Sequence, residues 1–345
     1  MKIAFVGNFE YNCGSSNTIL GYIRAGKTLG YDIRVSDFGN ADKTIRNSIP
    51  IASKNWKPDL MVIIYESYPF LSNETIERIC SYIPRSKRIL IDPDGKYLPP
   101  ISTENDTNHP TKDSYKYWTN LYDSLSDIVL QPCINMPHKA NIKKFFYFGI
   151  GTKTTEIKKQ HKDFELAYVG NNWYRWHDIE WLVKITSSIR SILKRIALIG
   201  QFWSGEVMEE FKEATYSEPE LLQKNQIEVY EPAPYGQVEK AMGRSYLHPI
   251  FIRPILCKIE FVTPRMFETL LADTLPVIPP YFTYANKLYG KNIEKFTLYS
   301  DDPTKDIANI FNNYKANKKV VDEIRWYLKV NHSYEVRLKE LTQFV

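Results

Sequence analysis

An arginine and a glutamate three residues apart, Arg265 and Glu268, follow a proline of the kind that begins helices, Pro264. This spacing places both side chains on one side of a helix, near its amino end. Helix amino ends attract phosphate through their free N–H groups, and a guanidinium adds a bidentate contact. A carboxylate one turn further on can hold a ribose diol. The pair fits a nucleotide site, and it fits equally well a surface ion pair that caps a core helix.

Carboxylates also follow two of the short apolar runs. Asp92 and Asp94 lie in the sequence Asp-Pro-Asp-Gly directly after the run 88–91, and Glu66 follows the run 60–65. Side chains at the carboxyl ends of parallel strands face the ligand crevice, where an aspartate can act as general base on an acceptor hydroxyl. The alternative, which turn chemistry favours, is a Pro-Asp-Gly turn with both carboxylates in water.

Apolar runs alternate with amphipathic stretches of helix length along the whole chain. Strands are predicted at residues 3–7, 33–35, 60–65, 88–91, 127–130, 144–148, 164–170, 195–200, 227–230, 246–252 and 276–278. Helices are predicted at residues 16–30, 75–82, 178–193, 237–242, 267–272, 304–314 and 318–341. The stretch 152–163 is polar and lysine-rich, with no apolar period, which predicts a linker with solvated lysines.

Strand–helix alternation on both sides of a linker predicts the α/β class, with two Rossmann-like doubly wound domains at residues 1–151 and 164–325. Such sheets bind ligands at the carboxyl ends of their strands, where the strand order reverses. Two domains facing each other across a cleft would form a small-molecule site between them.

The segment 263–278 reads T-P-R-M-F-E-T-L-L-A-D-T-L-P-V-I, which resembles the nucleotide-sugar segment of GT-B glycosyltransferases, closest to the CgeB-like and glycosyltransferase family 4-like branch. The resemblance implies that Glu268 holds the donor ribose, and that Arg265 and Thr263 face the diphosphate. Glu260 and Glu268 also have the E-x7-E spacing of retaining members, which would place Glu260 near the donor sugar.

Three further segments support the same resemblance. Residues 167–175, A-Y-V-G-N-N-W-Y-R, are similar to the loop that opens the donor domain and imply donor contacts from Gly170, Asn171 and Arg175. A plain turn with a solvated arginine remains the alternative for Arg175. Residues 326–345 contain the family's closing H-x-Y-x-x-R pattern, in a helix that would pack back on the first domain. The loop after the first strand would face the acceptor, which implies acceptor contacts from three residues: Asn8, Ser15 and Ser16.

The chain departs from the family pattern at two places. Asp273 occupies the position where a glycine is usual before the last strand, and residues 261–263, F-V-T, replace a glycine-containing loop. The second departure bears most directly on Glu260, which precedes that loop.

Composition bounds the class of protein. Hydrophobic residues make up 43% of 345 residues and the net charge is +5, which suits a folded protein with an anionic ligand and is too weak to require nucleic acid. Cys13, Cys80, Cys133 and Cys257 are far apart, with no metal-ligand spacing. We therefore expect no metal, no membrane span and a cytoplasmic location.

The predicted function is metal-independent transfer of a sugar from a nucleotide-diphosphate sugar to an acceptor hydroxyl. A UDP-sugar is the first candidate for the donor, and the enzyme is expected to be a monomer or a dimer. The acceptor could be a glycan, a small molecule, a protein or a hydroxymethylated DNA base. The E-x7-E spacing favours retention at the sugar carbon, whereas a base at Asp94 suits inversion. Two alternatives stay open: a catalytically silent nucleotide- or glycan-binding scaffold, and a non-hydrolysing sugar-nucleotide epimerase.

Overall fold

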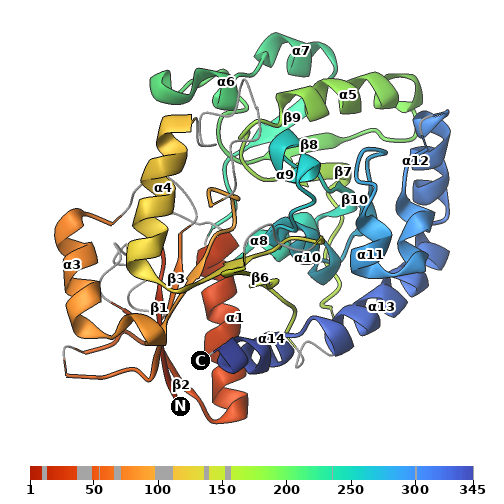
Figure 1. Cartoon of the computed structure of the whole chain (residues 1–345). Helices are drawn as coiled ribbons and strands as arrows, with labels where there is room; N and C mark the ends of the chain where they lie inside the picture. The colour runs from red at the N-terminus through yellow and green to blue at the C-terminus, as the bar shows by residue number, and fades with distance from the viewer. Residues whose placement is uncertain are drawn as a thin grey trace. The chain divides into compact units, whose positions relative to one another are not determined.

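A computed structural model describes residues 1–9, 14–36, 49–53, 55–65, 71–97, 112–135, 140–151, 157–234, 236–299 and 301–344, with only the backbone at 112–115. The chain forms two compact units (Figure 1). Unit 1 comprises Met1–Lys153, Ile259–Pro264 and Lys329–Val345, and unit 2 comprises Thr154–Lys258 and Arg265–Leu328. No helix in the described ranges is long and apolar enough to cross a membrane.

Unit 1 is built on six parallel strands in the order β2-β1-β3-β4-β5-β6. They are β1 (Lys2–Val6), β2 (Asp32–Val35), β3 (Leu60–Ile64), β4 (Arg88–Ile91), β5 (Ile128–Gln131) and β6 (Ile142–Lys144). The central strands β3 and β4 are buried along their whole length, as expected when helices cover both faces of a parallel sheet. The chain winds one way from β1 to β2 and the other way from β3 onward, so the strand order reverses between β1 and β3.

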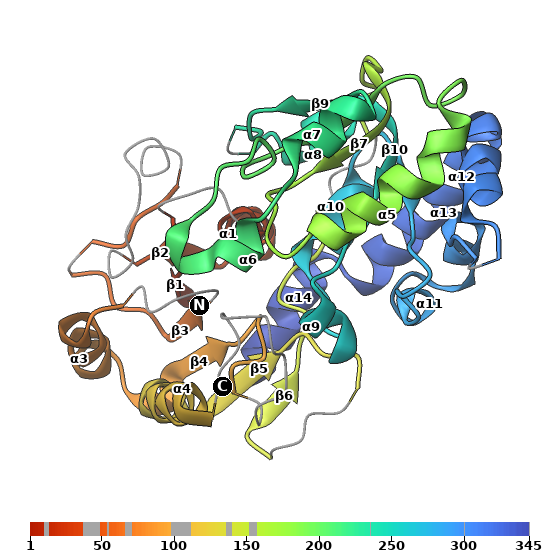
Figure 2. The same ribbon diagram turned by 90° about the horizontal axis from the view of Figure 1, so that it is seen from above.

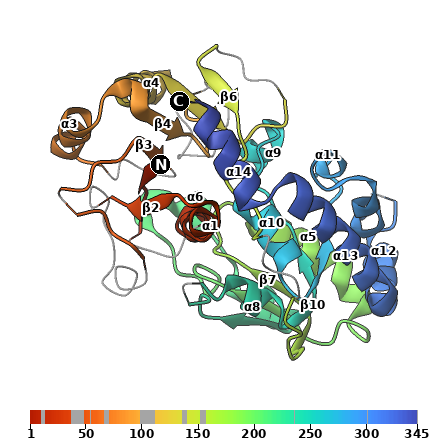
Figure 3. The same ribbon diagram turned by 90° about the horizontal axis from the view of Figure 1, so that it is seen from below.

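The helices of unit 1 follow from this winding. Right-handed crossovers place α1 (Gly14–Leu29) on the face opposite α3 (Asn73–Tyr82) and α4 (Lys112–Leu125), as Figures 1 and 2 show. α14 (Tyr334–Leu341) lies beside α1 (Figure 3). A Cβ on Gly21 of α1 would lie 2.3 Å from the ring of Tyr334, so the glycine permits this close packing.

Unit 2 has five parallel strands in the order β11-β10-β7-β8-β9. They are β7 (Phe164–Val169), β8 (Ile196–Ile199), β9 (Ile227–Tyr230), β10 (Ser245–Pro249) and β11 (Leu275–Val277). Here the order reverses between β7 and β10. The carboxyl ends of those two strands are therefore the expected ligand edge of this unit.

The remaining helices belong mainly to unit 2. They are α5 (Trp176–Thr186), α6 (Lys212–Thr215), α7 (Pro219–Lys224), α8 (Val238–Met242), α9 (Pro254–Lys258), α10 (Pro264–Leu271), α11 (Ala285–Tyr289), α12 (Pro303–Asn312) and α13 (Tyr314–Asn331). Short 3-10 turns occur at Arg85–Lys87, Ser187–Ile189, Glu209–Phe211, Lys291–Phe296 and Thr342–Phe344. α12 packs beside α5 (Figures 1 and 2), where the hydroxyl of Thr304 donates to the Ile185 carbonyl at 2.9 Å.

Two predicted elements differ clearly from the structure, and some helices were not predicted at all. The strand predicted at 144–148 is replaced by β6, because the four aromatic residues that follow β6 are all buried and leave the sheet. The helix predicted at 318–341 is broken at Ser333, whose side chain accepts from the N–H of Val336 and begins α14. The helix α4 was not predicted, although a tryptophan, a tyrosine and two leucines in it recur at helical spacing and are buried.

Residues Ile259–Pro264 join unit 1, although the sequence places them inside the second domain. Phe261 forms a bridge with Cys133, and the N–H of Val262 donates to the Pro132 carbonyl at 2.8 Å. These backbone contacts hold the segment against the residues that follow β5.

Candidate functional site

Arg265 lies in the first turn of α10 with its side chain 25% exposed. Its Nη1 is 3.3 Å from Oε2 of Glu268, whose side chain is 11% exposed. That contact lacks hydrogen-bond geometry, and among the described residues the buried Nη1 has no hydrogen-bond partner. A buried N–H group left unpaired costs about 1–3 kcal/mol. The pair is therefore not an exposed surface pair, and the guanidinium has unused capacity to donate.

Gly170 directly follows β7 and lies beside this guanidinium. A Cβ on Gly170 would lie 3.3 Å from Nη2 of Arg265 and 3.0 Å from the hydroxyl of Tyr168. Gly200, at the end of the neighbouring β8, is more constrained, because a Cβ there would lie 2.2 Å from the carbonyl oxygen of Gly170. Backbone atoms cannot move aside, so only glycine lets these two strand ends approach each other.

Two asparagines hold the loop that follows β7. Oδ1 of Asn171 accepts from the N–H of Gln201 at 3.0 Å, and its Nδ2 donates to Oε1 of Gln201 at 3.2 Å. Asn172 is fully buried, and its Nδ2 donates to the carbonyls of Phe202 and Tyr216 at 3.2 and 2.5 Å. Asn171, which was predicted to contact the sugar donor, thus joins the loop after β7 to the loop after β8. Asn172, which the sequence pattern did not single out, holds the loop after β7 in place.

Arg175 directly precedes α5 and is half-buried. Its Nη1 donates to the carbonyls of Trp173 and Tyr174 at 3.0 and 3.4 Å, while Nε is buried with no hydrogen-bond partner in the described part of the chain. Tyr174 has the left-handed φ of 55°, which folds the loop back towards the guanidinium. The fully solvated arginine of the alternative interpretation is not observed.

Asp178 is a buried carboxyl in the first turn of α5 that sequence reasoning missed, because it resembles an ordinary helix start. Its Oδ1 accepts from the Tyr281 hydroxyl at 2.6 Å and lies 3.2 Å from Nε2 of His177. Its Oδ2 is buried without a hydrogen-bond partner among the described residues. Burial raises the pKa of Asp178 to about 7, although the Arg175 charge and the Tyr281 hydrogen bond act to lower it.

Asp178→Asn is expected to remove a pH dependence of stability. Because the folded-state pKa is raised from 3.8 to about 7, the folded protein binds more protons than the unfolded chain between these values. Wild type should therefore lose roughly 2–3 kcal/mol from this group as the pH rises from about 5 to 7, and only about 0.4 kcal/mol more above pH 7. The variant keeps the acceptor for Tyr281 and should lose nothing here. Urea unfolding at both pH values measures the difference, and an unchanged loss in the variant would contradict the assignment.

The Asp-Pro-Asp-Gly turn after β4 is folded inward. Asp92 is fully buried and accepts from the N–H groups of Lys96 and Tyr97 at 3.0 and 2.9 Å and from Nε2 of Gln131 at 2.8 Å. Asp94 is buried too, with Oδ2 at 3.8 Å from Nζ of the buried Lys96. The interpretation with two carboxylates in water is wrong, because the turn packs over the carboxyl ends of its sheet.

The three predicted acceptor residues lie together at the end of β1. Asn8 follows the strand, while Ser15 and Ser16 are in the first turn of α1, and all three are buried. Oγ of Ser15 has no hydrogen-bond partner among the residues described. They mark the edge where the strand order of unit 1 reverses. The rival base Glu66 and the thiol Cys13 lie outside the described residues.

Glu260 is held by the residues that follow β5. It has a left-handed φ of 51°, its carbonyl accepts from the Ile134 N–H at 3.1 Å, and its Oε2 accepts from Nδ2 of Asn135 at 2.9 Å. Thr263 is partly exposed and immediately precedes Pro264 at the start of α10. Both predicted residues lie in the segment that belongs to unit 1.

Asp273, at the position of the expected glycine, is 2% exposed and fully engaged. Its Oδ1 lies 2.7 Å from Nζ of Lys318, its Oδ2 lies 3.2 Å from Nζ of Lys162, and Oδ2 also accepts from the Gln160 N–H at 2.9 Å. Lys162 was predicted to be a solvated linker lysine, and this is wrong because its ammonium is buried against Asp273. The carboxylate thus ties the segment before β7 and the helix α13 to the loop before β11.

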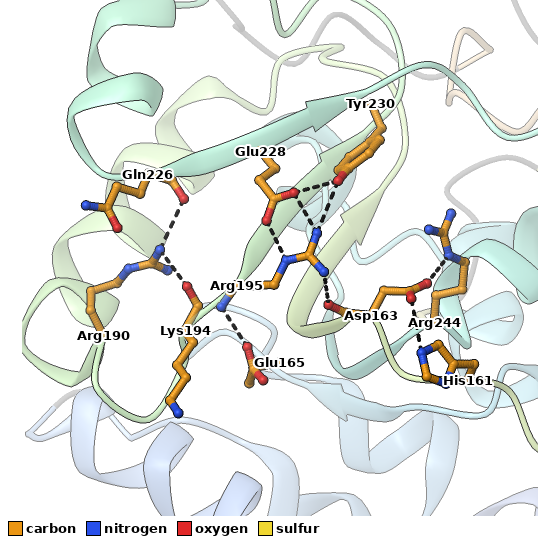
Figure 4. A network of polar contacts seen from close by, with 10 residues as sticks. All are labelled: His161, Asp163, Glu165, Arg190, Lys194, Arg195, Gln226, Glu228, Tyr230 and Arg244. Atoms are coloured by element: carbon orange, nitrogen blue, oxygen red, sulfur yellow. Dashed lines mark hydrogen bonds and ion pairs between the residues drawn. The ribbon is translucent and has the colours of Figure 1, made fainter.

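A second polar cluster occupies the amino ends of the unit 2 strands (Figure 4). Nε and Nη2 of Arg195 donate to the two carboxylate oxygens of Glu228, both at 2.8 Å, and Nη1 donates to the Asp163 carbonyl at 2.9 Å. Asp163 in turn pairs with Arg244 at 2.5 Å. Since the cluster lies at the end of the sheet away from Gly170, it fixes the strands and takes no part in the candidate site.

No family model and no curated protein matches this sequence. Solved structures do match over the whole chain. The beta-glucosyltransferase of phage T4 with UDP and Mn²⁺ is 13% identical, with a TM-score of 0.61, and the match covers 100% of this chain and 99% of that one. An alpha-glucosyltransferase with UDP and a 13-mer DNA containing an HMU (hydroxymethyluracil) base is 11% identical, with a TM-score of 0.69 and the same coverage.

A bacterial structure matches as well. HepE of Anabaena in complex with UDP-glucose is 12% identical, with a TM-score of 0.63 and coverage of 99% of this chain and 98% of that one. These neighbours share the two Rossmann-like domains of the GT-B fold. Two parallel doubly wound sheets and whole-chain agreement with these structures show that this protein has the GT-B fold.

Proposed function

We propose that the protein is a glycosyltransferase that moves a sugar from a UDP-sugar to an acceptor hydroxyl, with unit 2 holding the donor and unit 1 the acceptor. The observation that carries this proposal is the guanidinium of Arg265 at the amino end of α10, whose buried Nη1 lies 3.3 Å from Glu268 and forms no hydrogen bond with the described residues. An oxyanion is the ligand that such a group favours. The solved neighbours with this fold hold UDP or UDP-glucose.

The donor roles follow from the places of the residues in unit 2. Arg265 and the first N–H groups of α10 would bind the diphosphate, with Thr263 at the entry to the helix. Glu268 would hold the ribose diol, since its carboxylate lies one turn further on. Gly170 and Asn171 would let the loop after β7 approach the donor closely. Arg175 would supply a second cation for phosphate.

In the reaction, the acceptor oxygen forms a bond to C1 of the sugar while the bond from C1 to the diphosphate breaks. The negative charge that develops on the leaving diphosphate is stabilised by Arg265 and the helix N–H groups, so the proposal needs no divalent metal. Asp94 would take the acceptor proton, and Asp92, whose oxygens accept four hydrogen bonds, would hold the turn that carries it. Glu260 would lie near the donor sugar.

For the acceptor we propose a hydroxymethylated base in DNA. Glucosyltransferase neighbours include one bound to DNA that contains such a base, and the net charge of +5 suits a polyanion. The base would have to be flipped out of a duplex to react.

Two further assignments belong to this proposal. The 263–278 motif supports membership of the CgeB-like branch. The described cysteines Cys80, Cys133 and Cys257 are free thiols, which supports a location in the cytoplasm.

Titration with nucleoside diphosphates tests the donor assignment. We expect UDP and one or more UDP-sugars to raise the melting temperature, with roughly 2.7 kcal/mol of added stability at about 100 times Kd. Hydroxymethylated DNA and each UDP-sugar, with and without EDTA, then test turnover. Binding without transfer to any acceptor would support the scaffold alternative, conversion of the sugar nucleotide alone would support the epimerase, and no nucleotide binding would contradict the donor site.

A further inference from the structure

A buried hydrogen-bond relay links the two backbone segments that flank the candidate donor site. The N–H of Val169, the residue before Gly170, donates to Nε2 of His248 at 3.1 Å. Nδ1 of the same ring lies 3.1 Å from Oγ1 of Thr269, which donates to the Arg265 carbonyl at 3.1 Å. The imidazole on β10 therefore connects the end of β7 to the first turn of α10.

The direction of every bond in this relay follows from the backbone. Because the Val169 N–H is a donor, Nε2 of His248 must accept, and the ring proton is on Nδ1. Nδ1–H then donates to the oxygen of Thr269, whose own hydroxyl proton goes to the Arg265 carbonyl. Each proton in the relay has one acceptor, so every polar atom of the imidazole and the hydroxyl is used, which is the condition under which a buried polar network is rigid. Burial, and next the charge of Arg265, lower the pKa of His248 well below its usual value, so the neutral ring is kept.

Packing holds the ring in place. His248 is fully buried and stacks on the ring of Tyr168, with centroids 5.8 Å apart, and Tyr168 also contacts Phe251 and Trp203. Nε1 of Trp203 donates to the Gly170 carbonyl at 2.9 Å. The same cluster that fixes the imidazole therefore fixes the strand end against which the Arg265 guanidinium lies.

We propose that His248 and Thr269 are positioning residues for the donor diphosphate: the relay sets the first turn of α10 so that the Arg265 guanidinium lies against Gly170. This inference rests on the proposed donor site and names the residues that hold its arginine in position. Neither residue touches the ligand. Their loss should weaken the contacts of the diphosphate and leave the contacts of the nucleoside unchanged.

The test compares UDP with uridine by calorimetric titration. Thr269→Val keeps the shape of the side chain but removes the hydroxyl, and we expect the Kd for UDP to rise about three- to tenfold with the uridine Kd unchanged. Thr269→Ser keeps the hydroxyl and should bind UDP as wild type does. The matched control is Thr186→Val, since Thr186 is another buried helical threonine that donates to the carbonyl four residues back, Leu182, at 2.8 Å.

The outcomes separate the relay from the donor site itself. If Arg265→Ala loses UDP affinity but Thr269→Val does not, the relay is overturned and the donor site stands. If wild type binds no UDP, both the proposed relay and the proposed donor site are wrong. Equal losses for UDP and uridine in Thr269→Val, or a loss of the same size in Thr186→Val, would show a general structural effect and overturn the positioning role. Should Thr269→Val not fold, Thr269→Ala carries the same test, because it also lacks the hydroxyl.

Discussion

Replacing Arg265 with alanine is expected to raise the Kd for UDP by about 10- to 100-fold, the range for charge-assisted hydrogen bonds to a bound anion. Among the described residues its Nη1 forms no hydrogen bond, and its ion pair is with Glu268 in the same helix, so we expect the fold to tolerate its loss. The melting temperature without ligand should therefore stay close to that of wild type. Calorimetric titration with UDP, together with thermal unfolding of the free protein, measures both effects.

Two further variants sharpen this result. Arg265→Lys keeps the positive charge but lacks the planar fork, so it should recover only part of the affinity. Arg244→Ala removes one positive charge at the amino ends of the strands, where Arg244 pairs with Asp163, and should bind UDP as wild type does. A similar loss of UDP affinity in Arg244→Ala would mean that net charge, and not a specific contact, attracts the nucleotide.

Replacing Asp273 with alanine is expected to lower the free energy of unfolding by about 3–5 kcal/mol, the cost of breaking a buried ion pair. The change leaves the buried ammonium of Lys162 without its carboxylate and releases Lys318 and the Gln160 N–H. Burial acts to raise the pKa of Asp273, but these three partners outweigh it and hold the pKa below its usual value. Chemical denaturation at neutral pH measures the loss.

The sign of the pH effect gives a second measurement on the same site. A carboxyl whose folded-state pKa is depressed contributes stability above its unfolded pKa and loses that contribution as the pH falls through the folded value. The difference in the free energy of unfolding between wild type and Asp273→Ala should therefore decrease as the pH is lowered. Asp163→Ala, which breaks the exposed pair with Arg244, is the control and should cost less than about 1 kcal/mol. A loss of unfolding free energy in Asp273→Ala as small as that of the control would show that Lys162 and Lys318 become hydrated when the carboxylate is removed.

Local sequence was sufficient for most of the scaffold. The apolar runs at 60–65 and 88–91 predicted the buried strands β3 and β4, because residues covered on both faces must be apolar throughout. The neighbourhood of Arg265 and Glu268 was also predictable, since three residues span nearly one helical turn whatever surrounds the helix. Strand–helix alternation on both sides of residues 152–163 indicated two doubly wound sheets, as the structure shows.

Contacts between distant segments were not predictable in this way. Burial of Asp92 and Asp94 depends on Gln131 and Lys96 meeting the turn, and turn chemistry alone favoured water. The break at Ser333 lies in a stretch whose apolar period would continue one helix. Ser333 caps α14, which packs on the distant helix α1.

What the sequence by itself determined is most of the strands, several of the longer helices and the local pairing of Arg265 with Glu268, because strand burial and helical spacing are properties of neighbouring residues. Only the tertiary structure decided how the site is held. The approach of Gly200 to Gly170, the relay through His248, and the lysines around Asp273 all join residues far apart in the chain. Each of these contacts exists because parallel strands bring their carboxyl or amino ends to one edge of a sheet, which no single segment can specify.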